Sequence, residues 1–141
     1  MTAEVFRDGW VHTGDLGYLD QEGFLFLVGR TNDVIISGGF NVYPAEVEDA
    51  LMAVPGTAAA VVTSLPDLEW GDRVVAALVP AEGAVLDPER VRAACREKLA
   101  GYKCPKEIRV VDEIPLNPNG KVNRAEARAL FTRTGAGEET R

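Results

Sequence analysis

The sequence is poor in the residues that build disulfide frameworks, metal centres and histidine-dependent active sites. Its 141 residues include two cysteines, Cys95 and Cys104, and one histidine, His12. Two cysteines argue against a disulfide framework or a structural zinc site. The sequence shows no nucleophile–histidine–acid set, so we interpret His12 as structural.

Positive charge and long apolar runs are also scarce. The chain carries 15 Lys and Arg against 22 Asp and Glu, a formal net charge of −7, and shows no long basic cluster. This balance argues against nucleic acid or an anionic membrane as a partner. No apolar run is long enough to cross a bilayer, and the first residues do not resemble a signal peptide, so we expect a cytoplasmic protein without a transmembrane segment.

Hydrophobic periodicity predicts an α+β fold, a small and mainly antiparallel sheet flanked by helices and preceded by a β-hairpin. Pro44 suits the first position of one helix, Asp87 is the expected N-cap of a second, and Asn123 with Glu126 predicts the start of the last. The expected strands are residues 16–20, 24–28, 33–37, 57–65, 73–80 and 107–112.

The chain divides into three parts. The hairpin within residues 1–31 cannot stand alone in water, so we expect these residues to be the C-terminal end of a larger N-terminal domain. Residues 32–134 have enough apolar positions for a core and form the expected main domain. Residues 135–141 are small and polar and are expected to fray.

Lys121 ends the segment Pro115-Leu-Asn-Pro-Asn-Gly120-Lys121. Two prolines and a glycine restrict the backbone to a turn with the lysine at its tip. A lysine is a compact cation on a long stem and can reach an anionic group on another surface. Taken alone, such a lysine is more commonly a solvated turn residue than a catalytic one.

Two charged residues near the hairpin have similar double interpretations. Asp15 follows Gly14 and could accept two hydrogen bonds from the vicinal hydroxyls of a ribose, or could cap its own turn. Arg30 follows Gly29 and could bind phosphate or sugar oxygens through its fork, or form a surface ion pair of little energetic value.

The segment Ser37-Gly38-Gly39 lets another backbone or a thin ligand chain approach closely, although a flexible turn is equally consistent. Trp70 lies in a polar loop and marks either a binding surface or a cover for the local core.

Two cations, Lys103 and Lys106, lie beside Pro105 and could meet a phosphate-bearing ligand, or could simply be solvated. Cys95 is expected in the core. Cys104, next to a lysine, could be a reactive thiol, but nothing in the sequence requires it.

Taken together, Thr13-Gly14-Asp15, Gly29-Arg30, the stretch Ser37–Glu48 and Gly120-Lys121 closely resemble the C-terminal part of the AMP-forming acyl-CoA synthetases. These belong to the adenylate-forming enzymes, together with firefly luciferase and the adenylation domains of peptide synthetases. The resemblance extends from Thr2 to about Arg133, and the Ser-Gly-Gly form is similar to the acyl-CoA synthetase branch.

The resemblance implies a ligase that activates a carboxylic acid with ATP to an acyl-adenylate and then transfers the acyl group to coenzyme A. ATP, coenzyme A and Mg²⁺ are the implied cofactors, bound mainly by an N-terminal domain. Asp15 and Arg30 are implied to contact the nucleotide ribose. Lys121 is implied to bridge the carboxylate and the phosphate during adenylation.

The resemblance also implies a large rotation of the C-terminal domain between the two steps. The hinge position is Asn32, where relatives commonly have aspartate or lysine. After rotation, Ser37, Gly38 and Gly39 line the coenzyme A tunnel. The residues implied near the entrance of that tunnel are Trp70, Tyr102, Lys103, Cys104 and Lys106.

Two functional hypotheses follow. The first is the mobile C-terminal part of an acid–CoA ligase, with the N-terminal domain of the same ligase as its partner and no activity in isolation. The alternative is a standalone binding module, or a substrate domain for a protein acetyltransferase acting on Lys121. The spacing from Pro115 to Gly120-Lys121 resembles the segment that such enzymes recognise.

Overall fold

The computed structural model describes residues 6–7, 9–11, 15–30 and 33–132, and all structural statements below concern these residues. His12 and Asn32 lie outside them. Two small antiparallel hairpins come first: β1 (Phe6–Arg7) pairs with β2 (Trp10–Val11), and β3 (Asp15–Leu19) pairs with β4 (Leu25–Arg30). The turn between β3 and β4 is closed by Asp20, whose Oδ1 accepts from the N–H groups of Glu22 and Phe24 at 2.9 Å each.

A five-stranded sheet forms the body of the molecule, with the order β6-β5-β8-β7 and β9 also paired to β8. Its pairs are antiparallel except for β8 with β9, which run parallel. The strands are β5 (Ile35–Ser37), β6 (Phe40–Val42), β7 (Thr57–Asp67), β8 (Gly71–Pro80) and β9 (Glu107–Val110).

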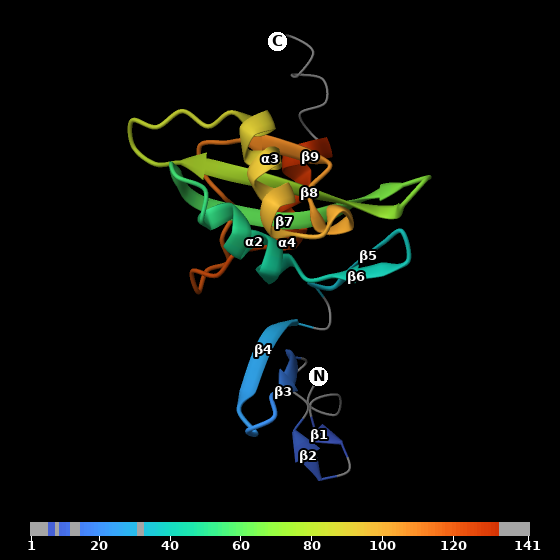
Figure 1. Cartoon of the computed structure of the whole chain (residues 1–141). Helices are drawn as coiled ribbons and strands as arrows, with labels where there is room; N and C mark the ends of the chain where they lie inside the picture. Colours follow the sequence, from blue (N-terminus) through green and yellow to red (C-terminus); the bar gives the residue numbers. More distant parts are fainter. Residues whose placement is uncertain (1–5, 8, 12–14, 31–32, 133–141) are drawn as a thin grey trace.

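Helices lie on both faces of this sheet. In Figure 1, α2 (Pro44–Met52) and α3 (Pro88–Lys98) lie in front of β7 and β8. The short helices α4 (Arg124–Ala127) and α5 (Ala129–Thr132) follow at the C-terminal side, and the 3₁₀ turn η2 (Gly101–Lys103) connects α3 towards β9. The predicted α+β class is therefore confirmed.

The molecule has two buried hydrophobic clusters, one on each face of the sheet, because successive side chains along β8 point to opposite faces. Val74, Ala76 and Leu78 point to the face covered by α2 and α3, whereas Val75 and Ala77 point to the face that carries α4 and α5. A strand that buries both faces reads as a continuous apolar run, which is why this segment was recognisable in the sequence.

Several strand ends differ from the prediction by one or two residues, as in β4, β5 and β9, and three further details differ. The segment after Ser37, expected as a loop, contains the strand β6. The loop around Trp70 is shorter than residues 66–72, because β7 continues to Asp67 and β8 begins at Gly71. The last helix divides at Arg128, whose carbonyl accepts from the N–H of Phe131, a tighter bond than that of an α-helix.

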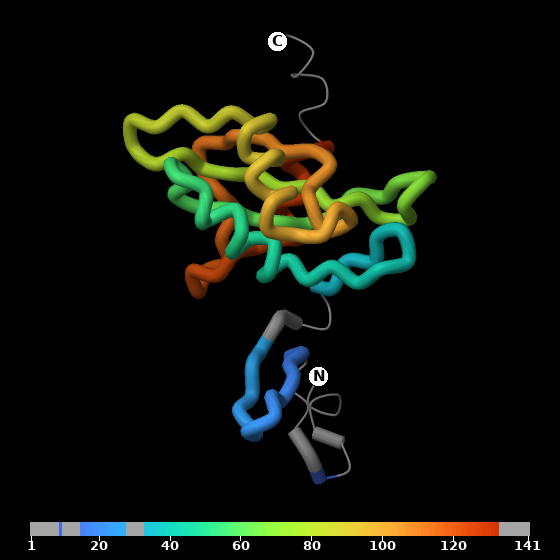
Figure 2. Tube along the Cα trace, in the orientation of Figure 1, coloured from blue at the N-terminus to red at the C-terminus, as the bar shows by residue number. Residues whose placement is uncertain are grey.

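The hairpin β3–β4 lies apart from the five-stranded sheet, as the tube in Figure 2 shows. Its contacts with the body run mainly from β4 to α2. None of its residues belongs to either buried cluster.

Candidate functional site

The Lys121 turn is closed by backbone hydrogen bonds. The N–H of Asn117 donates to the carbonyl of Lys121 at 2.7 Å, and the N–H of Gly120 donates to the carbonyl of Asn117 at 2.8 Å. Gly120 has a φ of 87°, a conformation that favours glycine. Leu116 and Val122 form a bridge across the base of the turn. The backbone therefore holds Lys121 in place while its side chain remains exposed.

Helix α4 anchors the turn directly after Lys121. Its N-cap is Asn123, whose side chain accepts from the N–H of Glu126 at 3.0 Å, as the sequence predicted. The N–H of Asn123 also donates to the carbonyl of Pro115 at 3.0 Å, which ties the two ends of the segment together.

The Ser37-Gly38-Gly39 segment is the tight turn between β5 and β6. Gly38 and Gly39 have φ values of 60° and 85°. The N–H of Gly38 donates to the carbonyl of Trp70 at 2.8 Å, and a Cβ at Gly38 would lie 2.9 Å from Cε3 of Trp70. Gly38 is therefore required both by its backbone conformation and by the indole packed against it.

Aromatic and cationic side chains surround this turn. The ammonium of Lys106 lies 4.3 Å from the centre of the Trp70 ring, and Phe40 stacks on Tyr102 with 4.6 Å between ring centres. The structure thus brings together Gly38, Trp70 and Lys106, which are far apart in the sequence.

Lys103 is engaged in an ion pair rather than free for a phosphate. Its ammonium donates to both carboxylate oxygens of Glu46, at 3.0 and 2.9 Å. This hydrogen bonding raises the pKa of Lys103. The pair joins η2 to the first turn of α2, so Lys103 helps to fix Tyr102 beside Phe40.

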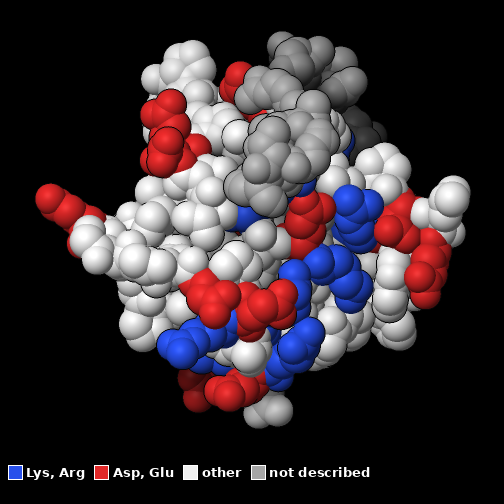
Figure 3. Space-filling view, turned by 90° about the horizontal axis from the view of Figure 1, so that it is seen from above, with Lys and Arg blue, Asp and Glu red and all other residues white. Residues whose placement is uncertain are grey.

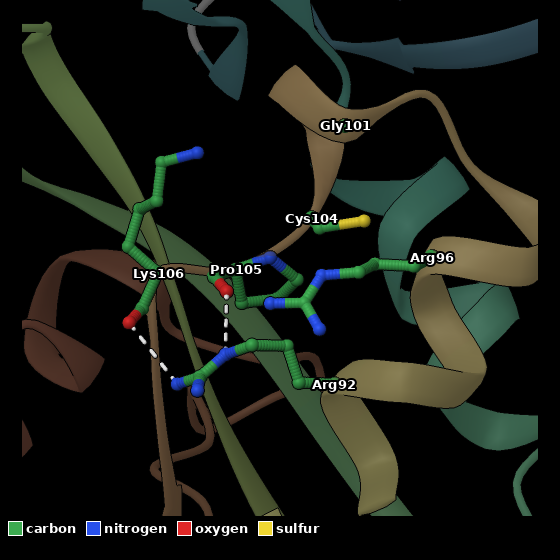
Figure 4. A pocket seen from close by; sticks show the side chains of 6 residues that line it. All are labelled: Arg92, Arg96, Gly101, Cys104, Pro105 and Lys106. Carbon is green, nitrogen blue, oxygen red and sulfur yellow. Dashed lines mark hydrogen bonds between the residues drawn. The ribbon is translucent and has the colours of Figure 1, made fainter. Parts of the chain in front are cut away.

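A neighbouring pocket of about 210 Å³, shown in Figure 4, is lined by Arg92, Arg96, Gly101, Cys104, Pro105 and Lys106. Arg92 donates to the carbonyl of Lys106 at 3.1 Å and to that of Pro105 at 3.4 Å. Arg92 therefore holds the backbone that precedes β9 and presents Lys106.

Cys104 is buried, and burial is the main reason why its pKa is raised. Its thiol donates to the carbonyl of Ala100 at 3.7 Å. A reactive cysteine needs a lowered pKa, so the suggestion of a reactive thiol is wrong. Cys95 lies in the core as predicted, with a pKa raised to about 11.

Asp15 and Arg30 are cross-strand partners at the open end of the β3–β4 hairpin. The two residues predicted to contact a ribose therefore come from the same end of one hairpin. Asp15 is exposed, and the side chain of Arg30 lies outside the described part of the chain.

The Lys121 turn and the β5–β6 turn lie at different ends of the domain. In Figure 1 the dark orange segment before α4 projects at the left of the body, whereas β5 and β6 lie at its right. Across the face seen from above, acidic and basic side chains are intermixed (Figure 3).

Sequence reasoning missed Phe40, Glu46, Arg92 and Arg124, which support the predicted residues. Each acts through a partner distant in sequence, such as Glu46 with Lys103, so no local pattern could have identified them. The described residues include no group of three or more His, Cys, Asp or Glu that could hold a metal ion. Nor does the described part contain a helix long and apolar enough to cross a membrane.

Comparisons with known proteins agree with these features. The family model for the AMP-binding enzyme C-terminal domain matches residues 46–121. The chain is 45% identical over 130 residues to a feruloyl-CoA synthase of Amycolatopsis sp, covering 92% of the chain and 26% of that protein. It is 48% identical over 129 residues to a 2-succinylbenzoate–CoA ligase of Bacillus cereus, with the same coverage of 92% and 26%.

Solved structures give the same result. The o-succinylbenzoate CoA synthetase of Bacillus subtilis, in complex with the acyl-adenylate OSB-AMP, has a TM-score of 0.83 at 43% identity, over 87% of this chain and 25% of that one. The amide bond synthetase McbA of Marinactinospora thermotolerans has a TM-score of 0.86 at 41% identity, over 92% and 27%. This chain thus spans about a quarter of the relatives that it matches. It belongs to the AMP-binding enzyme C-terminal domain family.

Proposed function

We propose that this chain is the C-terminal portion of an acid–CoA ligase that converts a carboxylic acid and ATP to an acyl-adenylate and then forms the coenzyme A thioester. The observation that carries the proposal is the identity of 45–48% to a feruloyl-CoA synthase and a 2-succinylbenzoate–CoA ligase across 92% of the chain. Residues 32–134 are the mobile part, and residues 1–31 belong with the large N-terminal domain.

The proposed role of Lys121 is to lie between the substrate carboxylate and the ATP phosphate during adenylation. Two anions repel as they approach, and a cation held between them offsets this repulsion most where charge concentrates. The exposed side chain on a closed backbone turn supports this role. Asp15 and Arg30 would hold the nucleotide ribose, because the hairpin register sets them opposite each other.

The proposed coenzyme A surface is the β5–β6 turn with its surroundings. Gly39 has no atom within 4 Å of an added Cβ, so a thin ligand chain can pass there. Trp70, Tyr102 and Lys106 offer aromatic faces and a cation beside it. Lys103, paired with Glu46, contributes by positioning Tyr102. Mg²⁺ would accompany ATP, but the described residues offer no cluster to hold it.

The two surfaces cannot serve one active site at the same time, because they lie at different ends of the domain. This separation supports a rotation between the two half-reactions, with Asn32 as the proposed hinge. An Asn32→Pro substitution fixes φ and should therefore impair thioester formation more than adenylation.

A chimaera tests the proposed function. This chain would replace the matching quarter of the Bacillus cereus 2-succinylbenzoate–CoA ligase, and the two half-reactions would be measured separately. We expect both activities, with adenylation lowered by roughly 10²–10³ in a Lys121→Ala variant. A folded chimaera that exchanges pyrophosphate equally well with and without Lys121 would disprove the role of this lysine.

The isolated chain is expected to show no ATP–pyrophosphate exchange, because the acyl and ATP sites are proposed to lie elsewhere.

Lys121 is also a proposed target for a protein acetyltransferase, since acetylation would remove the charge that adenylation needs. Mass spectrometry after incubation with such an enzyme should find the acetyl group on Lys121, and an unmodified Lys121 would remove this proposal.

A further inference from the structure

Arg124 binds two carboxylates at once. One terminal nitrogen donates to Oδ2 of Asp33 at 3.0 Å, and the other donates to Oε1 of Glu48 at 2.7 Å. The three side chains are only 16–28% exposed, so water screens them less than surface ion pairs. A single guanidinium therefore holds together the start of the domain, helix α2 and helix α4.

Glu48 is fixed independently of Arg124. Its second oxygen, Oε2, accepts from the backbone N–H of Val62 on β7 at 2.9 Å. The Glu48 carboxylate, held by β7, is therefore a fixed partner for Arg124, and Asp33 is its second partner.

Asp33 and Lys121 border the same open hollow, together with Arg124 and the residues between them. Asp33 is the only carboxylate among the described residues that line this hollow. Within the described part of the chain, no group accepts a hydrogen bond from the Lys121 ammonium. An unpaired Asp33 would therefore offer this ammonium an anion from its own chain.

We propose that Arg124 is a positioning residue for Lys121: it holds the Asp33 carboxylate in an ion pair, so that the lysine ammonium stays free for an incoming anion. That the lysine has to be free for an anion rests on the proposed function. The electrostatic relation between Arg124, Asp33 and Lys121 is independent of that function and can be measured on the chain itself.

The test uses the 141-residue chain with isotope-labelled lysine and follows the pKa of Lys121 by NMR. Because removal of Arg124 would also leave Glu48 without its ion partner, all variants are compared in a Glu48→Gln background. In that background, adding Arg124→Met should raise the pKa of Lys121 by about one unit, at the low end for an opposite charge nearby. Acylation of Lys121 by acetic anhydride should then slow by about tenfold, since the free amine is the reactive form.

A third substitution separates electrostatics from structure. Adding Asp33→Asn to the double variant should return Lys121 to its behaviour in the Glu48→Gln protein. The matched control is Arg128→Met in the same background, which removes an exposed arginine in the same region without exposing Asp33. This control should leave both the pKa of Lys121 and its rate of acylation unchanged.

Two results would overturn the inference. The first is an unchanged pKa and acylation rate of Lys121 in a folded variant that carries Glu48→Gln and Arg124→Met. The second is acylation that remains slow after Asp33→Asn is added. Should the double variant lose its fold, Asp33→Asn in the otherwise unaltered chain decides. It should lower the pKa of Lys121 by much less than one unit, because Arg124 already offsets much of that carboxylate's charge, and a drop of one unit or more would contradict the proposal. None of these readouts depends on ligase activity, so a failed chimaera would not affect them.

Discussion

Gly38 and Gly39 illustrate how two identical neighbours meet different constraints. Both have positive φ, but only Gly38 lies against another side chain, with Cε3 of Trp70 at 2.9 Å from an added Cβ. Gly39 faces open space. The first glycine therefore serves packing as well as backbone conformation, and the second serves conformation and access.

Alanine at either position should destabilise the chain, and alanine at Gly38 should do so more. The left-handed conformation costs a residue with a Cβ roughly 1–2 kcal/mol, and Gly38→Ala must in addition displace Trp70. Urea unfolding measures the difference, with Gly39→Ala as the control for the backbone cost alone. Equal losses of stability in the two variants would contradict the close approach to Trp70.

Glu48 is the less exposed of the two acids in the Arg124 cluster, with 16% of its side chain exposed against 28% for Asp33. Burial raises the pKa of its carboxyl above the ordinary value of 4.5, against the opposing effects of the Val62 N–H and Arg124. The folded state therefore binds a proton at this site more readily than the unfolded chain does. Its favourable contribution to stability is present below the ordinary pKa and is lost as the pH rises through the folded pKa.

This linkage predicts a pH-dependent difference between two proteins. The stability of the unaltered chain minus that of Glu48→Gln should fall as the pH rises through the range just above 4.5. Urea unfolding at a series of pH values measures both proteins side by side. A difference that grows with pH would mean that the ion pair with Arg124 outweighs burial.

At the level of elements, side chains from helices fix the loops that carry the candidate sites. Arg92 on α3 donates to the carbonyls of Pro105 and Lys106, directly before β9. Glu46 on α2 holds Lys103 of η2. The position of Lys106 over Trp70 therefore depends on a helix contact as well as on its own loop.

Removal of the Arg92 side chain should cost more stability than removal of an exposed arginine from the same helix. In an Arg92→Met variant the two carbonyls lose their charged donor, and a partly buried acceptor without a partner costs about 1–3 kcal/mol. Arg90→Met is the matched control, because the Arg90 side chain is 90% exposed. Chemical denaturation compares the two, and equal effects would show that the carbonyls find water instead.

At the level of the whole molecule, the chain joins a well-packed body to a hairpin with apolar side chains in solvent. The exposed apolar residues of the hairpin are Tyr18, Leu19, Phe24, Leu25, Phe26 and Leu27. Side chains alternate along a strand, so Tyr18 and Phe26 lie on one face of the hairpin and Leu19 and Leu25 on the other. Exposed apolar side chains in this number mark an interaction site. Its position agrees with the proposal that residues 1–31 belong with another domain.

A chain restricted to residues 33–132 should therefore fold with an unfolding midpoint close to that of the full chain. The hairpin contributes no residue to either buried cluster, so its loss removes no core contact. The shorter chain should also self-associate less, because the apolar hairpin surface is absent. Urea unfolding and sedimentation of both proteins measure these effects, and a large loss of stability would show that the hairpin supports the body.

The sequence by itself determined the α+β class, most of the strands, the turns at Gly38 and Gly120, and the family. These depend on local patterns: apolar periodicity, helix caps and glycines at tight turns, all of which are short-range. The strand β6 and the division of the last helix at Arg128 were missed. The first is defined by its pairing with β5 and the second by the hydrogen bond from the Phe131 N–H to the Arg128 carbonyl, and apolar periodicity indicates neither.

Only the tertiary structure decided which residues meet. It set Trp70 against Gly38 and Lys106, paired Lys103 with Glu46, and joined Arg124 to Asp33 and Glu48. These partners lie up to 91 residues apart in the chain. These contacts depend on how α2, α4 and the loops pack on the sheet. The spacing of residues along the sequence does not indicate that packing.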